Sequence, residues 1–241
     1  MTSLSAICFS ALALACAAMP VGAATVSGSV RLTDSLNPEV RKRQDYSGVV
    51  VWLEPAGPVR AAASRPPANA RMEQRGKRFI PHVIAIQAGA SVEFPNFDPI
   101  FHNAFSSFSG QIFDLGLYPP GTSKNITFRR TGIVRVFCNI HPTMSAVIVV
   151  VRGPWLAVTN AAGGLAIKDV PPGEYTLHVF HERSTAETLR SLQSRIAVEG
   201  ADLALRPISI SETGYLEAPH QNKYGHDYPP VPDERGYQVE R

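Results

Sequence analysis

The sequence predicts an all-β protein built from two small β-sandwiches, one of them of the Greek-key type. Short runs of apolar, often β-branched residues recur along the chain, and clusters of turn-forming residues separate them. The 241 residues include 20 prolines and 18 glycines, a composition that favours turns over long helices. This length is sufficient for one large or two small domains with real cores.

The first strands are expected at residues 25–34 and 47–53, separated by a polar, proline-containing loop that carries Arg41, Lys42 and Arg43. Residues 55–75 are rich in alanine, proline and arginine and predict a linker or exposed loop. Strand-like patterns resume at Arg78. The expected strands there are residues 79–86, 91–94, 124–129 and the two apolar runs of 132–151.

The loop between the last two runs holds three residues that ligate soft metals. Cys138 is followed at +3 by His141 and at +6 by Met144. Because alternate strand residues share a face, Cys138 is expected to point into the core with Val134 and Val136. A thiolate, an imidazole and a thioether are therefore expected between two rigid strands.

Two histidines, one cysteine and a weak methionine ligand form the trigonal arrangement that suits copper. The second histidine must come from elsewhere in the chain, and His102 is the best candidate. It follows an expected strand and lies among proline and phenylalanine residues rather than charges. The sequence thus predicts one mononuclear copper site with the ligands His102, Cys138, His141 and Met144.

These residues resemble the cupredoxins. The pair His102-Asn103 and the spacing Cys138-x-x-His141-x-x-Met144, with proline directly after the second histidine, are most similar to the amicyanin type. The resemblance covers residues 66–152 and implies a blue (type 1) copper protein that passes single electrons to transient redox partner proteins. It also implies that Asn103 helps to hold the loop of the thiolate.

One position departs from the amicyanin pattern, because Ile140 stands where that type has proline. Isoleucine keeps a backbone N–H near the sulfur. We expect this N–H to stabilise the reduced state and so to raise the reduction potential.

A second resemblance involves the segment VTNAAGGLAIKDVPPGEYTLHVF, residues 158–180, which is similar to carboxypeptidase regulatory-like or collagen-adhesin B-type sandwiches. Such domains usually begin with strands like those of residues 25–60. We therefore expect residues 25–60 and 153–212 to form one sandwich around the inserted cupredoxin. A short helix is expected within 182–195, and residues 213–241 are expected to form an irregular tail.

Residues 1–24 are apolar and end in small residues, which indicates a secretory signal peptide and a periplasmic location. A lipoprotein anchor at Cys16 is a less favoured alternative. No other segment is long enough to span a membrane. Removal of the leader leaves Cys138 as the only cysteine, and metal ligation explains an unpaired thiol in an oxidising compartment.

The other polar residues are expected to be structural. We expect His82 to be half-buried, His178 and His181 to face opposite sides of a strand, and the tail residues His220 and His226 to be exposed. Lone carboxylates beside turns usually cap backbone groups, which we expect of Asp98 and Asp114. The basic clusters at 41–43 and 75–78 are expected to be solvated loops rather than a nucleic-acid site.

No enzyme motif is present in the sequence. Asn139 occupies the position beside the cysteine where multicopper oxidases and nitrite reductases need a histidine. The favoured function is one-electron transfer through an exposed edge at His141. The alternatives are a copper carrier, or a surface interaction module with structural copper. The sequence does not indicate the oligomeric state.

Overall fold

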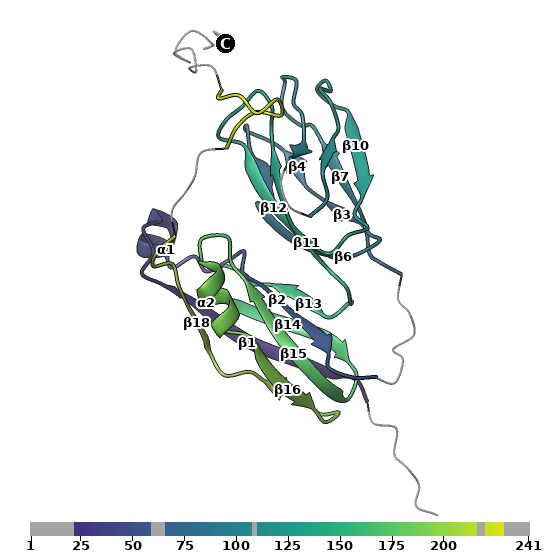
Figure 1. Cartoon of the computed structure of the whole chain (residues 1–241), viewed down its shortest axis with the longest axis vertical. Coiled ribbons are helices and arrows are strands. Elements are labelled where there is room, and N and C mark those ends of the chain that lie inside the picture. Colours follow the sequence, from purple (N-terminus) through teal and green to yellow (C-terminus); the bar gives the residue numbers. More distant parts are fainter. Residues whose placement is uncertain (1–21, 59–65, 108–109, 216–219, 229–241) are drawn as a thin grey trace, which may run out of the picture.

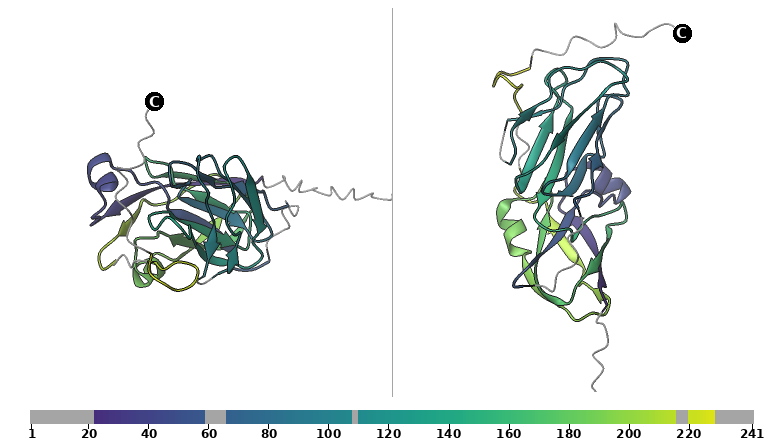
Figure 2. Two further views of the ribbon diagram at one scale, coloured as in Figure 1. Left: turned by 90° about the horizontal axis from the view of Figure 1, so that it is seen from above. Right: turned by 90° about the vertical axis from the view of Figure 1, so that its right-hand side faces the viewer.

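The prediction of an all-β protein is confirmed. The computed structural model describes residues 22–58, 66–107, 110–215 and 220–228. Within these ranges the chain forms strands β1 to β18 and two short helices, α1 (Pro38–Arg43) and α2 (Ala186–Ser191) (Figure 1). The strands gather in two bodies that lie one above the other along the long axis of the molecule (Figure 2). The expected leader, residues 1–24, lies almost wholly outside the described residues.

The upper body, which we call the site sandwich, consists of β3 to β12. One of its sheets has the order β10-β7-β3, the other has the order β6-β12-β11-β8-β9, and β4 and β5 form a small hairpin. The strands are β3 (Ala70–Arg71), β4 (Glu73–Gln74), β5 (Phe79–Ile80), β6 (Val83–Gln87), β7 (Ser91–Pro95), β8 (Phe105–Ser106), β9 (Phe113–Asp114), β10 (Ser123–Thr127), β11 (Gly132–Phe137) and β12 (Ser145–Val151).

Strand β12 is apolar on both faces, and its surroundings explain why. Ala146, Ile148 and Val150 belong to the core between the two sheets of the site sandwich. The alternate residues Val147 and Val149, with Val151, belong to a separate apolar cluster between the two bodies. A strand covered on both faces has no polar alternation, so the sequence here is a continuous apolar run.

The lower body, the flanking sandwich, combines strands from both ends of the chain. Its sheets have the orders β14-β1-β17, with β18 also paired to β1, and β13-β2-β15-β16. The strands are β1 (Ala24–Thr33), β2 (Val50–Pro55), β13 (Leu156–Val158), β14 (Gly164–Val170), β15 (Gly173–Phe180), β16 (Ser194–Val198), β17 (Leu203–Ala204) and β18 (Ile208–Ser211). Strands β1 and β2 thus pair with strands that follow the site sandwich, while the domain boundaries stay a prediction.

The two bodies meet through side chains of both. Val50 of β2 and Phe180 of β15 pack in one buried cluster with Val83, Val147 and Val149 of the site sandwich. At the edge of this cluster, His82 Nε2 lies 2.8 Å from a carboxylate oxygen of Glu182. Apolar burial and one ionisable pair therefore join segments that are far apart in the sequence.

The expectation of a loop around Arg41–Arg43 is wrong, because these residues end helix α1. The Asn37 side chain accepts a hydrogen bond from the backbone N–H of Glu39, and Pro38 occupies the first turn, where its missing N–H costs nothing. Val40 is buried, and the three basic residues lie in the last turn, where the helix dipole favours positive charge. Capping and one apolar contact thus outweigh the polar composition.

Candidate metal centre

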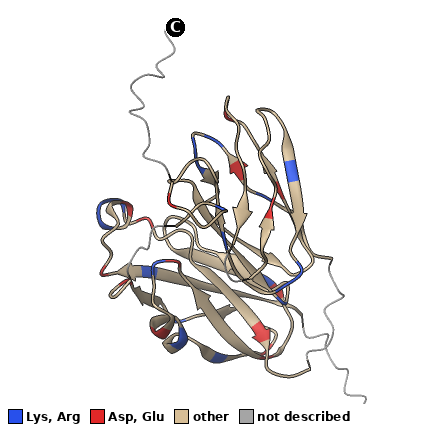
Figure 3. Ribbon diagram, turned by 45° about the horizontal axis from the view of Figure 1, so that its top comes forward, with Lys and Arg blue, Asp and Glu red and all other residues tan. Residues whose placement is uncertain are grey.

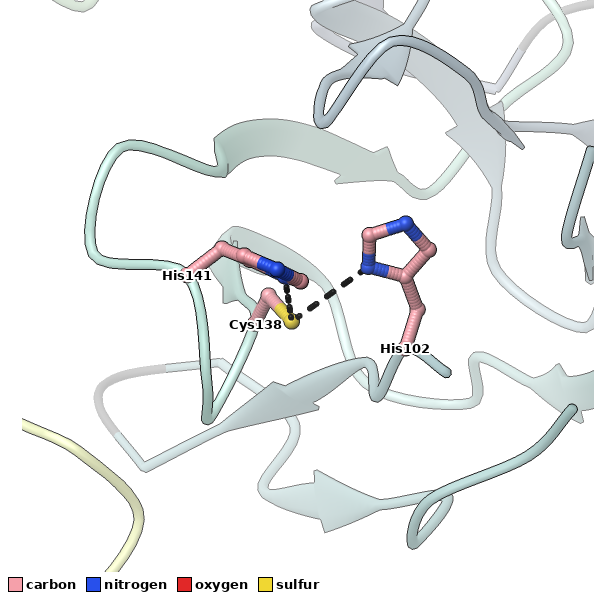
Figure 4. Close-up of side chains that lie close together, drawn as sticks. All are labelled: His102, Cys138 and His141. Atoms are coloured by element: carbon pink, nitrogen blue, oxygen red, sulfur yellow. Dashed lines mark hydrogen bonds between the residues drawn. The ribbon is translucent and has the colours of Figure 1, made fainter. Parts of the chain in front are cut away.

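Three of the four predicted ligands converge at one end of the site sandwich. Cys138 follows β11 directly, His141 lies in the loop to β12, and His102 lies between β7 and β8. One donor atom from each of the three lies within 4.8 Å of the others. Cys138 Sγ is 3.6 Å from His141 Nδ1 and 3.8 Å from His102 Nδ1, and both rings point these nitrogens at the sulfur (Figure 4).

Backbone hydrogen bonds fix the loop that supplies two of these side chains. The N–H of Cys138 donates to the carbonyl of Met144 at 3.2 Å, and the N–H of Met144 donates to the carbonyl of His141 at 3.1 Å. The ends of the loop are thereby held together where β11 and β12 separate. His102 is held independently, since it exchanges both backbone hydrogen bonds with Tyr118.

The spacing of the donor atoms fits a bound metal ion. A metal bonded to sulfur at about 2.3 Å and to nitrogen at about 2.0 Å, with angles of about 110–120°, holds those atoms about 3.5–3.7 Å apart. The observed distances of 3.6 and 3.8 Å are close to these values. His102 and Cys138 are fully buried, and His141 is partly exposed. The three side chains thus form a nearly closed site of one sulfur and two nitrogen donors.

Met144 is fully buried and belongs to the same core cluster as Cys138. Its backbone bonds to both Cys138 and His141 show that it closes the ligand loop. Its role as the fourth ligand stays a prediction.

Asp98 orients the His102 ring. Its Oδ2 lies 2.8 Å from His102 Nε2, the ring nitrogen that faces away from Cys138. If Nε2–H donates to the carboxylate, Nδ1 is left with a free lone pair directed at the sulfur. Burial raises the pKa of Asp98. The hydrogen bonds from the backbone N–H groups of Lys77 and Gly76 and the bond to His102 lower this pKa by more, so the net shift is downward. Asp98 is therefore held as a carboxylate.

Sequence reasoning missed this role. Asp98 was expected only to cap backbone groups, which it does at Gly76 and Lys77, but it also contacts a predicted ligand. A carboxylate four residues before His102 was the available signal, because ligating histidines commonly donate their other ring N–H to a carboxylate.

The Cys138 thiol lies in competing surroundings. Burial raises its pKa, and this effect exceeds the opposite effect of hydrogen bonds from the backbone N–H groups of Ile140, Asn103 and His141. The thiol therefore holds its proton more tightly than a free cysteine, and a metal ion that binds there must displace that proton. The same N–H groups face the sulfur and would stabilise the negative charge of a thiolate.

Asn103 links the His102 segment to the cysteine loop. Its Oδ1 accepts a hydrogen bond from the N–H of Asn139 at 3.3 Å, and its Nδ2 donates to Asp114 at 2.7 Å. Asp114 also accepts from the N–H of Gly116, which is the capping contact expected of it. Ile140 is 43% exposed at the rim of the site, and its backbone N–H is one of those that face the sulfur.

The remaining histidines lie apart from the site, with one exception. His82 pairs with Glu182, the His178 ring stacks on Trp52, and buried His181 bonds Glu212. His226 is exposed as expected. The expectation of exposure is wrong for His220, whose ring stacks on Phe137 beside the ligand loop, a long-range contact that nothing in the local sequence indicates.

No protein-family model and no curated protein matches the chain. Solved structures are similar over part of it. A purple cupredoxin from Nitrosopumilus maritimus is 20% identical with a TM-score of 0.32, covering 34% of this chain and all of the other. Amicyanin from Paracoccus versutus is 21% identical with a TM-score of 0.33, covering 41% of this chain and 97% of the other.

A copper-containing nitrite reductase from Thermus scotoductus SA-01 is 24% identical with a TM-score of 0.34. That alignment covers 52% of this chain and only 28% of the reductase. Since the TM-scores of all three structures lie below 0.5, we infer nothing about function from these likenesses.

Proposed function

We propose that this chain is a mononuclear type 1 copper protein that carries single electrons. The observation that supports it most is the group of fully buried Cys138 and His102 with partly exposed His141, whose donor atoms already have the spacing of a metal site. One thiolate and two imidazoles form the soft, trigonal donor set that suits copper in both oxidation states. When bound, copper would supply the one-electron redox chemistry.

The chain contributes a preformed and largely dry site. Asp98 fixes the His102 ring, Asn103 ties the His102 segment to the cysteine loop, and the Cys138–Met144 backbone bonds hold that loop closed. A site held in this way changes little in geometry between oxidation states, which favours rapid electron exchange. Met144 is proposed as the weak fourth ligand.

His141 is proposed as the edge through which electrons pass, because it is the least buried of the three clustered residues. Exposed apolar side chains lie on the neighbouring loops, with Phe101 at 53% exposure beside His102 and Ile140 at 43% beside His141. Exposed apolar residues of this kind are typical of surfaces that dock a partner. Redox partner proteins that bind transiently are the proposed partners.

Other features support the remaining parts of this function. The apolar residues 1–24 support export to the periplasm. Separately, neither helix of the described ranges is long and apolar enough to cross a membrane. Acidic and basic residues are interspersed along the ribbon, which supports a partner other than nucleic acid (Figure 3). We propose an electron carrier rather than an enzyme, because Asn139 stands beside Cys138 where multicopper enzymes need a histidine.

The alternatives are a copper carrier and an interaction module with structural copper. Complete burial of His102 and Cys138 favours electron transfer over a carrier, since a delivery site needs its ligands within reach of an incoming ligand. The test is voltammetry of the copper-loaded protein together with copper transfer to a chelator. We expect a reversible one-electron wave and slow transfer, whereas rapid transfer without a reversible wave would support the carrier.

A further inference from the structure

We propose that residues 220–228 form a clamp that positions the ligand loop from the outside. This inference rests on the proposed metal site and adds to it a function for the C-terminal segment. The clamp lies at the end of β11 and β12 that carries the ligand loop, as the yellow segment of Figures 1 and 2 shows. It is irregular and contains no helix or strand, so its placement depends on its contacts with the site sandwich.

Two side chains of the clamp bind carbonyl groups of the ligand loop. The Tyr228 hydroxyl donates a hydrogen bond of 2.8 Å to the carbonyl oxygen of Cys138. The Nε2–H of His220 donates to the carbonyl oxygen of Pro142 at 2.7 Å. These carbonyls belong to the predicted ligand Cys138 and to the residue directly after the predicted ligand His141. The clamp therefore holds the loop at Cys138 and directly after His141.

The clamp also covers the outer face of β11. Phe137 precedes Cys138, so strand alternation turns its ring away from the buried thiol. The His220 ring stacks on Phe137 with a centroid distance of 4.0 Å and an interplanar angle of 24°. Tyr228 packs edge-on against His220. The cysteine at the end of β11 thus has the core on one side and the clamp on the other.

Lys223 completes a closed ring of hydrogen bonds. Its backbone N–H donates to the Asn139 side chain at 3.0 Å, and its Nζ lies 2.8 Å from Asp114 Oδ2. Asp114 accepts from Asn103, which in turn accepts from the N–H of Asn139. The clamp is therefore connected both to the cysteine loop and to the segment that presents His102.

Together these contacts point to a positioning role rather than to general stabilisation of the fold. Each of these contacts ends on the ligand loop, on Phe137 directly before it or on Asp114, and opening the clamp leaves both β-sheets paired. Loss of the clamp is expected to let the loop open locally, which exposes Cys138 without unfolding the protein. A site held by fewer restraints is also expected to release its metal faster.

The experiment measures the reactivity of the Cys138 thiol in metal-free, full-length mature protein with a disulfide reagent such as dithionitrobenzoate. The test variant is H220A/Y228F, and the matched control is H226A/Y215F. The control removes the same groups from His226 and Tyr215, whose side chains have no contact with the ligand loop among those described above. Thermal unfolding checks that wild type and every variant are folded.

We expect H220A/Y228F to react at least about fivefold faster than wild type, since losing one ordinary hydrogen bond changes an opening equilibrium by about that factor. The control is expected to stay within about twofold. Y228F alone, which removes one oxygen atom, is expected to show a smaller rise. Equal rates in H220A/Y228F, Y228F and the control overturn the clamp.

This readout needs no metal, so it separates the two proposals. Faster thiol reaction in a protein that gives no blue copper spectrum would support the clamp and contradict the proposed function. In the copper-loaded protein, H220A/Y228F is expected to lose copper to a chelator faster than the control variant. An unchanged rate of copper loss contradicts the positioning role.

Discussion

Asp98 Oδ2 lies 2.8 Å from Nε2 of His102, while Nδ1 of the same ring points at the sulfur of Cys138. One carboxylate thus determines which ring nitrogen is free to bind a metal. The same carboxylate accepts a hydrogen bond from the backbone N–H of Lys77, in the turn between β4 and β5, at 2.8 Å. Asp98 therefore connects this turn to the centre of the site.

Replacing Asp98 with asparagine should weaken copper binding by about 10- to 100-fold, the effect typical of losing the partner of a ligating histidine. An amide cannot hold the ring as strongly, and it can present its NH₂ group to Nε2 and favour the wrong tautomer. Competition with a chelator of known affinity measures the change. D202N is the matched control, because Asp202 also accepts a backbone N–H but lies in the flanking sandwich. Affinity of D98N equal to that of D202N would contradict this role.

Replacing Ile140 with proline should lower the reduction potential. The substitution removes a backbone N–H that faces the Cys138 sulfur and would stabilise the reduced state more than the oxidised one. Loss of one hydrogen bond of about 1 kcal/mol corresponds to about 40 mV for a one-electron couple. I140A keeps the N–H and is the control for the lost side chain. A midpoint in I140P equal to or above that of I140A is the result that rules this explanation out.

The pair His82–Glu182 should make stability depend on pH. Burial lowers the pKa of His82, but the hydrogen bond and charge of Glu182, with the Ser145 carbonyl, raise it by more. Both ring nitrogens face acceptor oxygens, so only the protonated ring satisfies both contacts. Because the pKa of His82 is raised in the folded state, the pair adds to the free energy of unfolding. This contribution is complete below the unfolded pKa of about 6.5 and is lost as pH rises through the folded pKa.

Burial raises the pKa of Glu182, yet its partners, His82 first, lower it overall. Its contribution is therefore present above the unfolded pKa of about 4.5 and is lost at more acid pH. The free energy of unfolding of wild type, measured with urea, should be lower at pH 9 than at pH 6. The H82Q substitution should remove part of this decrease. The difference should be at most about 1 kcal/mol, because His82 is half-exposed. The exposed H226Q should behave as wild type, and an equal pH dependence in H82Q and wild type argues against the pair.

Residues 153–241 alone should not fold. Strand β1 pairs with β14, β17 and β18, and β2 pairs with β13 and β15, so the fragment lacks an inner strand of each sheet. Circular dichroism and amide dispersion in NMR spectra of the isolated fragment should be those of an unfolded chain. A cooperatively folded fragment would show that residues 25–60 and 153–212 are not one sandwich.

The sequence predicted what depends on short spacing. Cys138, His141 and Met144 lie within one turn between two apolar runs, so local strand alternation was enough to place the thiol in the core. His102 could be proposed because a copper site needs a second histidine and its neighbours are apolar. The thiol and both rings do meet, because their donor atoms lie within 4.8 Å of one another.

Contacts between residues that are far apart in the chain leave no periodic pattern in the sequence, so they could not be predicted from it. His82 and Glu182 lie 100 positions apart, and Tyr228 lies 90 positions from the cysteine whose carbonyl it binds. His220 looked like an exposed tail residue because its partner Phe137 is fixed only by tertiary packing. Helix α1 was missed because its signal is a single Asn-Pro cap followed by one buried valine.

The most direct test of the proposed function is the spectrum of the purified mature protein after addition of one equivalent of Cu(II). We expect an intense visible band from the Cys138 thiolate and a narrow copper hyperfine splitting in electron paramagnetic resonance. Both should be absent in C138S. A pale protein with an ordinary, wide hyperfine splitting, or a C138S variant that keeps the colour, would contradict a type 1 site formed by His102, Cys138 and His141.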